Sequence, residues 1–350
     1  MAGSHPVARA EHRLAGLSPV IGQPTAEAGG GIGCRLVDTE SNARIAGDCE
    51  PAGCPWLDDG AMASQPRDGS EPVADRPGTG GRVELLADLD RPGSWMLLVD
   101  GISQSHVDLD DPRHLDLEYM QRLGHLIDLA APTGTPLRVL HLGAGGLTLA
   151  RYAAAARPGS RQLAVEADAE VARLVRRRLP VGRAQPGWGR IGVRLGDARA
   201  VLEQLPAGSF DVVVADVFAG DRTPAHLTTV EFTKAAARVL APGGVYAVNV
   251  GDGPPLVHAR GRVAAVRAVF PHVCVMAEPA VLRGRRFGNL VVAGSGRELP
   301  LAGLTRRLAA DPFPARLVAG AELDGFTAGA APIVDACAEP SPPMPPEVFA

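Results

Sequence analysis

Between residues 137 and 294 the chain alternates short apolar runs with segments of helical periodicity. The runs LRVLHL, RQLAVEA, GRIGVRLG, FDVVVADV and GGVYAVNV predict buried strands, and a helical spacing of apolar residues follows each of them. Such alternation is typical of a parallel, doubly wound sheet. Only a loop separates the last two runs, HVCVMAE and NLVVAGS, so the final strand is predicted to be antiparallel. The predicted fold class is therefore α/β.

A smaller β-rich unit is predicted before this sheet. The runs RVELLADLD and SWMLLVDG flank the turn Arg91-Pro92-Gly93, which is a hairpin signal, and QSHVDLD can add a third strand. The apolar spacing within residues 114–131 then predicts an amphipathic helix. We therefore expect a β-hairpin subdomain at residues 81–112 and the α/β domain at residues 113–312.

The two ends of the chain differ in composition from this middle part. About a quarter of residues 1–80 are Gly or Pro, and no apolar periodicity persists there. Such a segment buries too little apolar surface to offset its ordering entropy, so residues 1–80 are predicted to be a disordered extension. By the same reasoning residues 313–350, which end in PSPPMPPEVFA, are predicted to be a largely disordered proline-rich tail.

Charge and composition argue against several classes of function. The formal net charge of −4 gives no electrostatic reason to expect a nucleic-acid partner. No uncharged apolar run approaches the length of a membrane span, and the first residues lack the apolar stretch of a secretion signal. Five irregularly spaced cysteines predict neither a disulfide framework nor a zinc site. We expect a cytoplasmic protein without a metal, a nucleic-acid partner or a membrane segment.

A glycine turn, Gly143-Ala144-Gly145-Gly146, directly follows the first strand of the predicted sheet. Ligands of such sheets bind at the carboxyl ends of the strands, and glycine lets the backbone approach them closely. An ordinary strand-to-helix turn is the alternative interpretation. A dinucleotide is matched less well than a single adenosine with a short charged tail, because the third glycine of a GxGxxG motif falls at Thr148.

Carboxylates end the later strands of the same sheet. Glu166, about twenty residues beyond the glycines, can accept hydrogen bonds from ribose hydroxyls. Asp197, followed by Ala198, can accept from the exocyclic amine of adenine, cap a helix, or do both. Asp216 ends FDVVVADV and Asp221 follows five residues later, where a catalytic or substrate-binding position and an ordinary turn are both possible. The order glycine turn, acid, acid is more specific than any one of these features.

These motifs make the chain similar to the spermidine synthase family over residues 82–294, and in particular to its divergent spermidine synthase-like branch. The resemblance is carried by MLLVDGISQSHVDLDDP, LEYMQRLGHLIDL, VLHLGAGG, LAVEAD, LGDA, FDVVVADVF and LAPGGVYAVNV. It implies a Rossmann-like sheet of the methyltransferase type, with residues 113–312 as the nucleotide-binding catalytic domain. It also implies decarboxylated S-adenosylmethionine as co-substrate, a small polyamine such as putrescine as acceptor, and a homodimer.

The resemblance further implies roles for individual residues. Gln104 and Tyr119 would flank the sulfonium and amine end of the nucleotide, and Tyr119 would also contact the acceptor. Glu166 would bind the ribose and Asp197 the adenine. Asp216 would lie beside the reacting amine, with Asp216 or Asp221 as the base. The set expected to bind the nucleotide is Gly143, Gly145, Gly146, Glu166, Asp197, Ala198 and Gln104.

The chain departs from the family pattern at two acidic positions. The family usually carries an aspartate at the position of Gly146, where it binds the aminopropyl ammonium of the nucleotide. It carries a second aspartate three residues after Asp216, where this chain has Ala219. Both departures concern the groups that bind or activate amines.

Three functions therefore remain open at the level of sequence. The leading hypothesis is aminopropyl transfer from decarboxylated S-adenosylmethionine to a polyamine. The second is methyl transfer from S-adenosylmethionine to a small acceptor. The third is a binding module that retains the nucleotide pocket but has lost catalysis.

Overall fold

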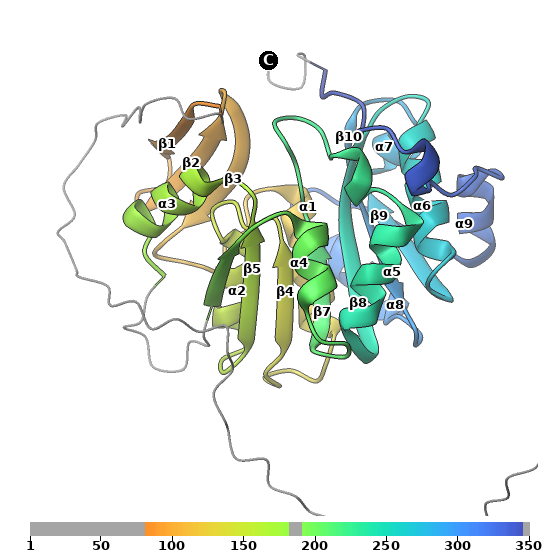
Figure 1. The fold of residues 1–350 in the computed structure, drawn as a ribbon, viewed down its shortest axis with the longest axis horizontal. Helices are drawn as coiled ribbons and strands as arrows, with labels where there is room; N and C mark the ends of the chain where they lie inside the picture. The colour runs from red at the N-terminus through yellow and green to blue at the C-terminus, as the bar shows by residue number, and fades with distance from the viewer. Residues whose placement is uncertain (1–80, 182–190, 346–350) are drawn as a thin grey trace, which may run out of the picture. The chain divides into compact units, whose positions relative to one another are not determined.

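The structure, a computed structural model, describes residues 81–181 and 191–345. The predicted extension at residues 1–80 and the last five residues of the chain lie outside this part. The main sheet has eight strands in the order β11-β9-β10-β8-β7-β4-β5-β6 (Figure 1). Their bounds are β4 Arg138–Leu142, β5 Arg161–Glu166, β6 Ile191–Leu195, β7 Phe210–Ala215, β8 Leu240–Asp252, β9 His272–Ala277, β10 Gly288–Ser295 and β11 Arg316–Ala319.

The strand directions confirm the predicted α/β topology. Strands β4 to β8 pair in parallel, and β10 is antiparallel to both of its neighbours, β8 and β9. The helices are α1 Glu118–Leu129, α2 Thr148–Ala156, α3 Ala169–Arg178, α4 Ala198–Gln204, α5 Val230–Val239, α6 Val257–Arg267, α7 Pro279–Leu282, α8 Leu301–Ala310 and α9 Gly320–Thr327. The carboxyl ends of β4 to β8 consequently meet at one edge of the sheet.

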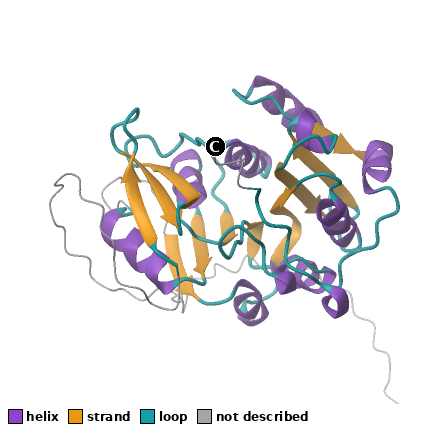
Figure 2. Cartoon of the chain, turned by 90° about the horizontal axis from the view of Figure 1, so that it is seen from above, coloured by secondary structure: helices purple, strands orange, loops and turns teal. Residues whose placement is uncertain are grey.

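Helices cover both faces of the main sheet, as Figure 2 shows from a second direction. Successive residues of a strand point to opposite faces, and the strands are apolar on both. In β7, for example, Val213 packs with residues of α4, α5 and α6, whereas Val212 and Val214 pack with residues of α1, α2 and α8. This burial on both faces explains why the strands appear in the sequence as continuous apolar runs.

The smaller N-terminal sheet is antiparallel and has the order β1-β2-β3, drawn in orange in Figure 1. Its strands are β1 Val83–Ala87, β2 Ser94–Val99 and β3 Ile102–Asp108, so the third strand suggested by QSHVDLD is present. Leu97 and Val107 share an apolar cluster with residues of α2 and α3. Strand β3 also contacts the start of α2, because Thr148 Oγ1 donates to the carbonyl of His106 at 2.8 Å. The small sheet is thereby fixed beside the glycine turn.

The prediction of a largely disordered tail at residues 313–350 is wrong for much of that segment. Residues 316–319 form β11, which pairs antiparallel with β9 at the edge of the main sheet, and α9 follows directly. Val318 and Leu323 are buried. A four-residue strand and an eight-residue helix are too short to give a clear apolar period, and their apolar contacts come from elements distant in the chain.

We expect Leu323→Ala to lower the free energy of unfolding by about 2–4 kcal/mol, because it removes buried methyl groups and leaves a cavity. Leu323 is 3% exposed. Leu301→Ala is the control: this leucine, on α8, is 37% exposed, and its truncation should cost about 0.5 kcal/mol or less. Urea denaturation measures both. Equal losses in the two variants would contradict the packing of α9 against the sheet.

Candidate active site

The glycine turn lies where β4 and β7 end side by side. Gly143 has φ +88°, and a Cβ on this residue would stand 1.9 Å from the backbone oxygen of Asp216. The Gly143 amide donates to the carbonyl of Val165 at 3.0 Å, and the Asp216 amide donates to that of Leu142 at 2.8 Å. Only glycine fits this position, and the turn is held directly against the end of β7.

Glu166 organises the same turn. Its Oε2 accepts from the amides of Ala144 at 3.2 Å and Gly145 at 2.9 Å, and its Oε1 accepts from the amide of Asp168 at 3.0 Å. Each carboxylate oxygen can accept more than one hydrogen bond, so the partly exposed carboxylate retains capacity for a ribose hydroxyl. The structure thus brings together the four predicted residues Gly143, Gly145, Gly146 and Glu166.

Gly146, where the resemblance leads one to expect an aspartate, faces strand β3. Its amide donates to Ser105 Oγ at 3.0 Å. A Cβ at Gly146 would stand 2.4 Å from Val107 Cγ2 and 3.2 Å from Ser105 Cβ. Side chains of the small sheet therefore occupy the space that a side chain at Gly146 would need in this chain.

Asp197 closes β6 next to Glu166, since the Gly196 amide donates to the carbonyl of Glu166 at 2.8 Å. Its Oδ1 accepts from the amides of Arg199 and Ala200, both at 3.0 Å, so the predicted helix cap is present, with Ala198 as the first residue of α4. Its Oδ2 lies 2.7 Å from His226 Nε2. Burial opposes ionisation of Asp197, but these hydrogen bonds outweigh it and lower its pKa below the ordinary value. The predicted contact with adenine stays a prediction.

Asp216 is a partly buried carboxylate held by neutral partners. Asn249 Nδ2 donates to its Oδ1 at 3.0 Å, and the Tyr119 hydroxyl forms a second hydrogen bond with it. Burial raises the pKa of Asp216 to about 6, although both hydrogen bonds act in the opposite direction. Burial and the charge of Asp216 raise the pKa of Tyr119 well above its usual value, so the phenol stays protonated and donates. A carboxylate that titrates near neutrality is suited to proton transfer.

Gln104 and Asp221 both contact the loop that follows β7. Gln104 Nε2 donates to the carbonyl of Gly220 at 3.2 Å, which links β3 to this loop. Asp221 Oδ2 accepts from the amide of Met344 at 3.0 Å, so the C-terminal segment reaches the loop as well. Ala219, the second departure, is exposed and pairs through its amide with the carbonyl of Arg222 at 2.7 Å. Of the two candidate bases, Asp216 is the one in contact with Tyr119.

Two residues of this region were missed in the sequence. His226, the partner of Asp197, comes 29 positions later, and no local pattern joins them. Asn249, the partner of Asp216, is the only polar side chain late in the apolar run GGVYAVNV. This polar residue in an apolar run was the sequence feature that could have indicated a role for Asn249.

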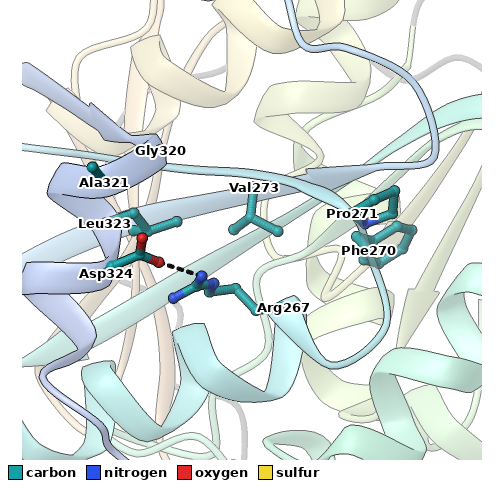
Figure 3. Close-up of a pocket in the computed structure, with 8 residues that line it drawn as sticks. All are labelled: Arg267, Phe270, Pro271, Val273, Gly320, Ala321, Leu323 and Asp324. Atoms are coloured by element: carbon teal, nitrogen blue, oxygen red, sulfur yellow. Dashed lines mark hydrogen bonds and ion pairs between the residues drawn. The ribbon is translucent and has the colours of Figure 1, made fainter. Parts of the chain in front are cut away.

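A separate cavity of about 340 Å³ lies at the opposite edge of the sheet (Figure 3). It adjoins the start of β9, which runs in the same direction as β8, so it is remote from the carboxyl ends of the parallel strands. The ion pair between Arg267 and Asp324 lines it. This cavity does not belong to the candidate active site.

Within residues 81–181 and 191–345, no three His, Cys, Asp or Glu side chains are grouped in a way that could hold a metal ion. In the same part of the chain, no helix combines the length and apolar character required to cross a bilayer.

Comparisons with known proteins point to one family. Residues 117–280 match the family model described as the spermine/spermidine synthase domain. The crystal structure of a probable spermidine synthase from Corynebacterium glutamicum is similar, with a TM-score of 0.69 and 37% sequence identity. The match covers 79% of this chain and 100% of that one.

Two curated relatives carry the name polyamine aminopropyltransferase. The protein from Chromobacterium violaceum is 29% identical over 151 residues, which are 43% of this chain and 55% of that protein. Polyamine aminopropyltransferase 2 of Streptomyces coelicolor is 37% identical over 123 residues, which are 34% of this chain and 22% of that protein. The chain therefore covers about half of the first relative and about a fifth of the second.

Gly143→Ala should destabilise the protein through the close approach to Asp216. Gly208→Ala is the matched control, because Gly208 also has a positive φ, +68°, but nothing lies within 4 Å of its Cβ position. Both variants incur the left-handed backbone cost of about 1–2 kcal/mol, and Gly143→Ala should lose about 1–3 kcal/mol more by overpacking. Chemical denaturation compares them. Equal stability of the two variants would contradict the close backbone contact.

Proposed function

Because the chain belongs to the spermine/spermidine synthase family, a family of transferases, we propose that it moves an aminopropyl group from decarboxylated S-adenosylmethionine to a small amine of the polyamine class, such as putrescine. The observation that supports this proposal is that two parts of the site meet where Gly143 contacts the backbone of Asp216. One half is a glycine turn ordered by Glu166. The other is the partly buried carboxylate of Asp216, whose hydrogen-bond partners are neutral.

In the nucleotide half, Glu166 would accept from the ribose hydroxyls and Asp197 would face the adenine. Both carboxylates lie at the carboxyl ends of adjacent strands. Glu166 is the last residue of β5 and pairs with Leu195, the last residue of β6, and Asp197 follows two residues later. The glycines leave room for the backbone to approach the ligand. Gln104 and Tyr119 would close the sulfonium end of the site, since they reach the Gly220 loop and Asp216 respectively.

In the transfer step, the nitrogen of a neutral amine attacks the methylene carbon beside the sulfonium. A C–N bond forms, the C–S bond breaks, and its electron pair returns to sulfur to give a neutral thioether. The nitrogen becomes positively charged and loses one proton to Asp216. The enzyme contributes alignment of the attack and a base with a pKa near neutrality. Asp216 is favoured over Asp221 as this base because it is the carboxylate in contact with Tyr119 and has the raised pKa.

Comparison of two nucleotides tests the donor. Decarboxylated S-adenosylmethionine should bind at least tenfold more tightly than S-adenosylmethionine in calorimetry, a difference of about 1.4 kcal/mol. Mass spectrometry should detect the aminopropylated product when putrescine is added. The reverse preference would support methyl transfer, and binding of either nucleotide without any product across a panel of amines would support the binding module.

The pH dependence of turnover tests the base. Activity should rise with pH through about 6, because Asp216 accepts a proton only when it is ionised. Tyr119→Phe removes a hydrogen bond that favours the carboxylate, so the rising limb should move to higher pH. Asp221→Asn is the control and should leave the limb in place. A limb that moves with Asp221→Asn and not with Tyr119→Phe would identify Asp221 as the base.

A further inference from the structure

The C-terminal part of the chain runs back along the loop between β7 and α5. We call residues 333–344 the C-terminal strap and residues 219–229 the β7–α5 loop. The amide of Ser341 donates to the carbonyl of Thr223 at 3.0 Å, and the amide of Thr223 donates to Ser341 Oγ at 2.8 Å. Both residues are buried, although they are 118 positions apart. This reciprocal pair fixes the strap to the middle of the loop.

A second attachment lies where the loop ends and α5 begins. The carboxylate of Asp335 accepts from both terminal nitrogens of Arg199, from Nη1 at 2.8 Å and from Nη2 at 2.6 Å. The side chain of Thr229 also forms a hydrogen bond with Asp335. The carbonyl of Ile333 accepts from the amide of Val230 at 2.8 Å. Because a bidentate pair of arginine and carboxylate fixes geometry as well as charge, this end of the strap is held in one orientation.

The β7–α5 loop in turn contacts two residues that we assign to the nucleotide half of the site. Asp197 Oδ2 lies 2.7 Å from His226 Nε2, and Gln104 Nε2 donates to the carbonyl of Gly220 at 3.2 Å. Arg199 Nη1 also donates to the carbonyl of His226 at 3.3 Å. Polar contacts therefore connect the strap, through Arg199 and His226, to Asp197.

The strap is held by polar contacts and not by the apolar core. Ser341 is its only buried residue, and none of its residues belongs to the apolar clusters of the described core. In contrast, Leu323 of α9, shortly before the strap, packs in one of those clusters. Segments with few buried apolar contacts open locally at a lower free energy than the core. Loss of the strap contacts should therefore release the loop while the main sheet stays folded.

We propose that the C-terminal strap orders the β7–α5 loop for nucleotide binding, with Asp335 and Ser341 as positioning residues. The inference rests on the proposed function for the identity of the ligand. When a binding-competent arrangement is populated only in part, the apparent affinity falls by that fraction. The hydrogen bonds to the Asp216 carboxylate come from Asn249 and Tyr119. We therefore expect the strap to affect nucleotide binding and not the transfer step.

Hydrogen-exchange mass spectrometry of the full-length double variant Asp335→Ala/Ser341→Ala tests the attachment. The variant removes the carboxylate that faces Arg199 and the hydroxyl that accepts from the Thr223 amide. Exchange in peptides from residues 219–229 should become faster by about tenfold, because local opening no longer breaks these contacts. Exchange in β4 and β7 should be unchanged.

Asp324→Ala is the matched control. It also removes an aspartate of the C-terminal region that pairs with an arginine, but this pair, with Arg267, lies at the separate cavity. Exchange in residues 219–229 should be the same in this variant as in the wild type. The urea midpoints of the control and of the double variant should agree, because neither change removes a side chain of the apolar clusters.

Nucleotide binding provides the functional readout. In calorimetry, the Kd for decarboxylated S-adenosylmethionine should rise by about tenfold in the double variant. At saturating nucleotide kcat should be unchanged, which is the pattern expected for a loss of uniform binding. In the wild type the nucleotide should slow exchange in the strap, because coupling between two sites is reciprocal.

Two results would overturn the inference alone. One is unchanged exchange of the loop in the double variant, and the other is faster exchange with an unaltered Kd. A fall in kcat without a change in Kd would also contradict it, because the strap would then act on the transfer step. Failure of the wild type to bind either S-adenosylmethionine or its decarboxylated form would overturn the proposed function, and the role of the strap in binding with it. The exchange of the loop would still decide whether the strap orders it.

Discussion

The contact between the backbones of Gly143 and Asp216 determines where the whole site lies. Strands β4 and β7 are neighbours at the centre of the sheet, and their ends meet so closely that a Cβ on Gly143 would stand 1.9 Å from the Asp216 oxygen. The glycine turn and Asp216 are therefore parts of one rigid joint. Because Glu166 binds the amides of the same turn, β5 is fixed to this joint as well. A nucleotide held by the turn is necessarily adjacent to Asp216.

The carboxylates around this joint differ in the number and kind of their hydrogen-bond partners. That difference suggests different roles for them. Backbone amides donate to Glu166 and Asp197 and orient both side chains, which suits the recognition of a neutral sugar and base. Asp216 has a phenol and an amide as its partners, and burial raises its pKa. A partly buried carboxylate with a raised pKa and no charged partner favours a cationic or proton-donating ligand. Under the proposed function, the side of Glu166 and Asp197 would bind the neutral sugar and base, and the side of Asp216 would bind the amine.

Features that depend on local sequence were predictable, and features that depend on distant contacts were not. The glycine turn, the strand-end acids and the antiparallel last run follow from neighbours in the chain, so the fold was predicted correctly, and the assignment of a site to these residues stays a prediction. Strand β11 was missed because four residues carry no periodic signal. Asn249 and Asp216 are 33 positions apart, and only the order of strands brings them together. The contact of Asp221 with Met344 spans 123 positions and had no signal at all.

The two acidic positions that this chain lacks have different physical origins. At Gly146 the small N-terminal sheet occupies the space, because Val107 and Ser105 lie where a side chain would begin. An aspartate there would require the Val107 side chain to shift. Ala219, by contrast, is exposed on a loop, where an aspartate would meet no such obstacle. The chain has instead a neutral amide in contact with Asp216. This arrangement leaves one carboxylate whose ionisation is controlled by burial and by two uncharged hydrogen-bond donors.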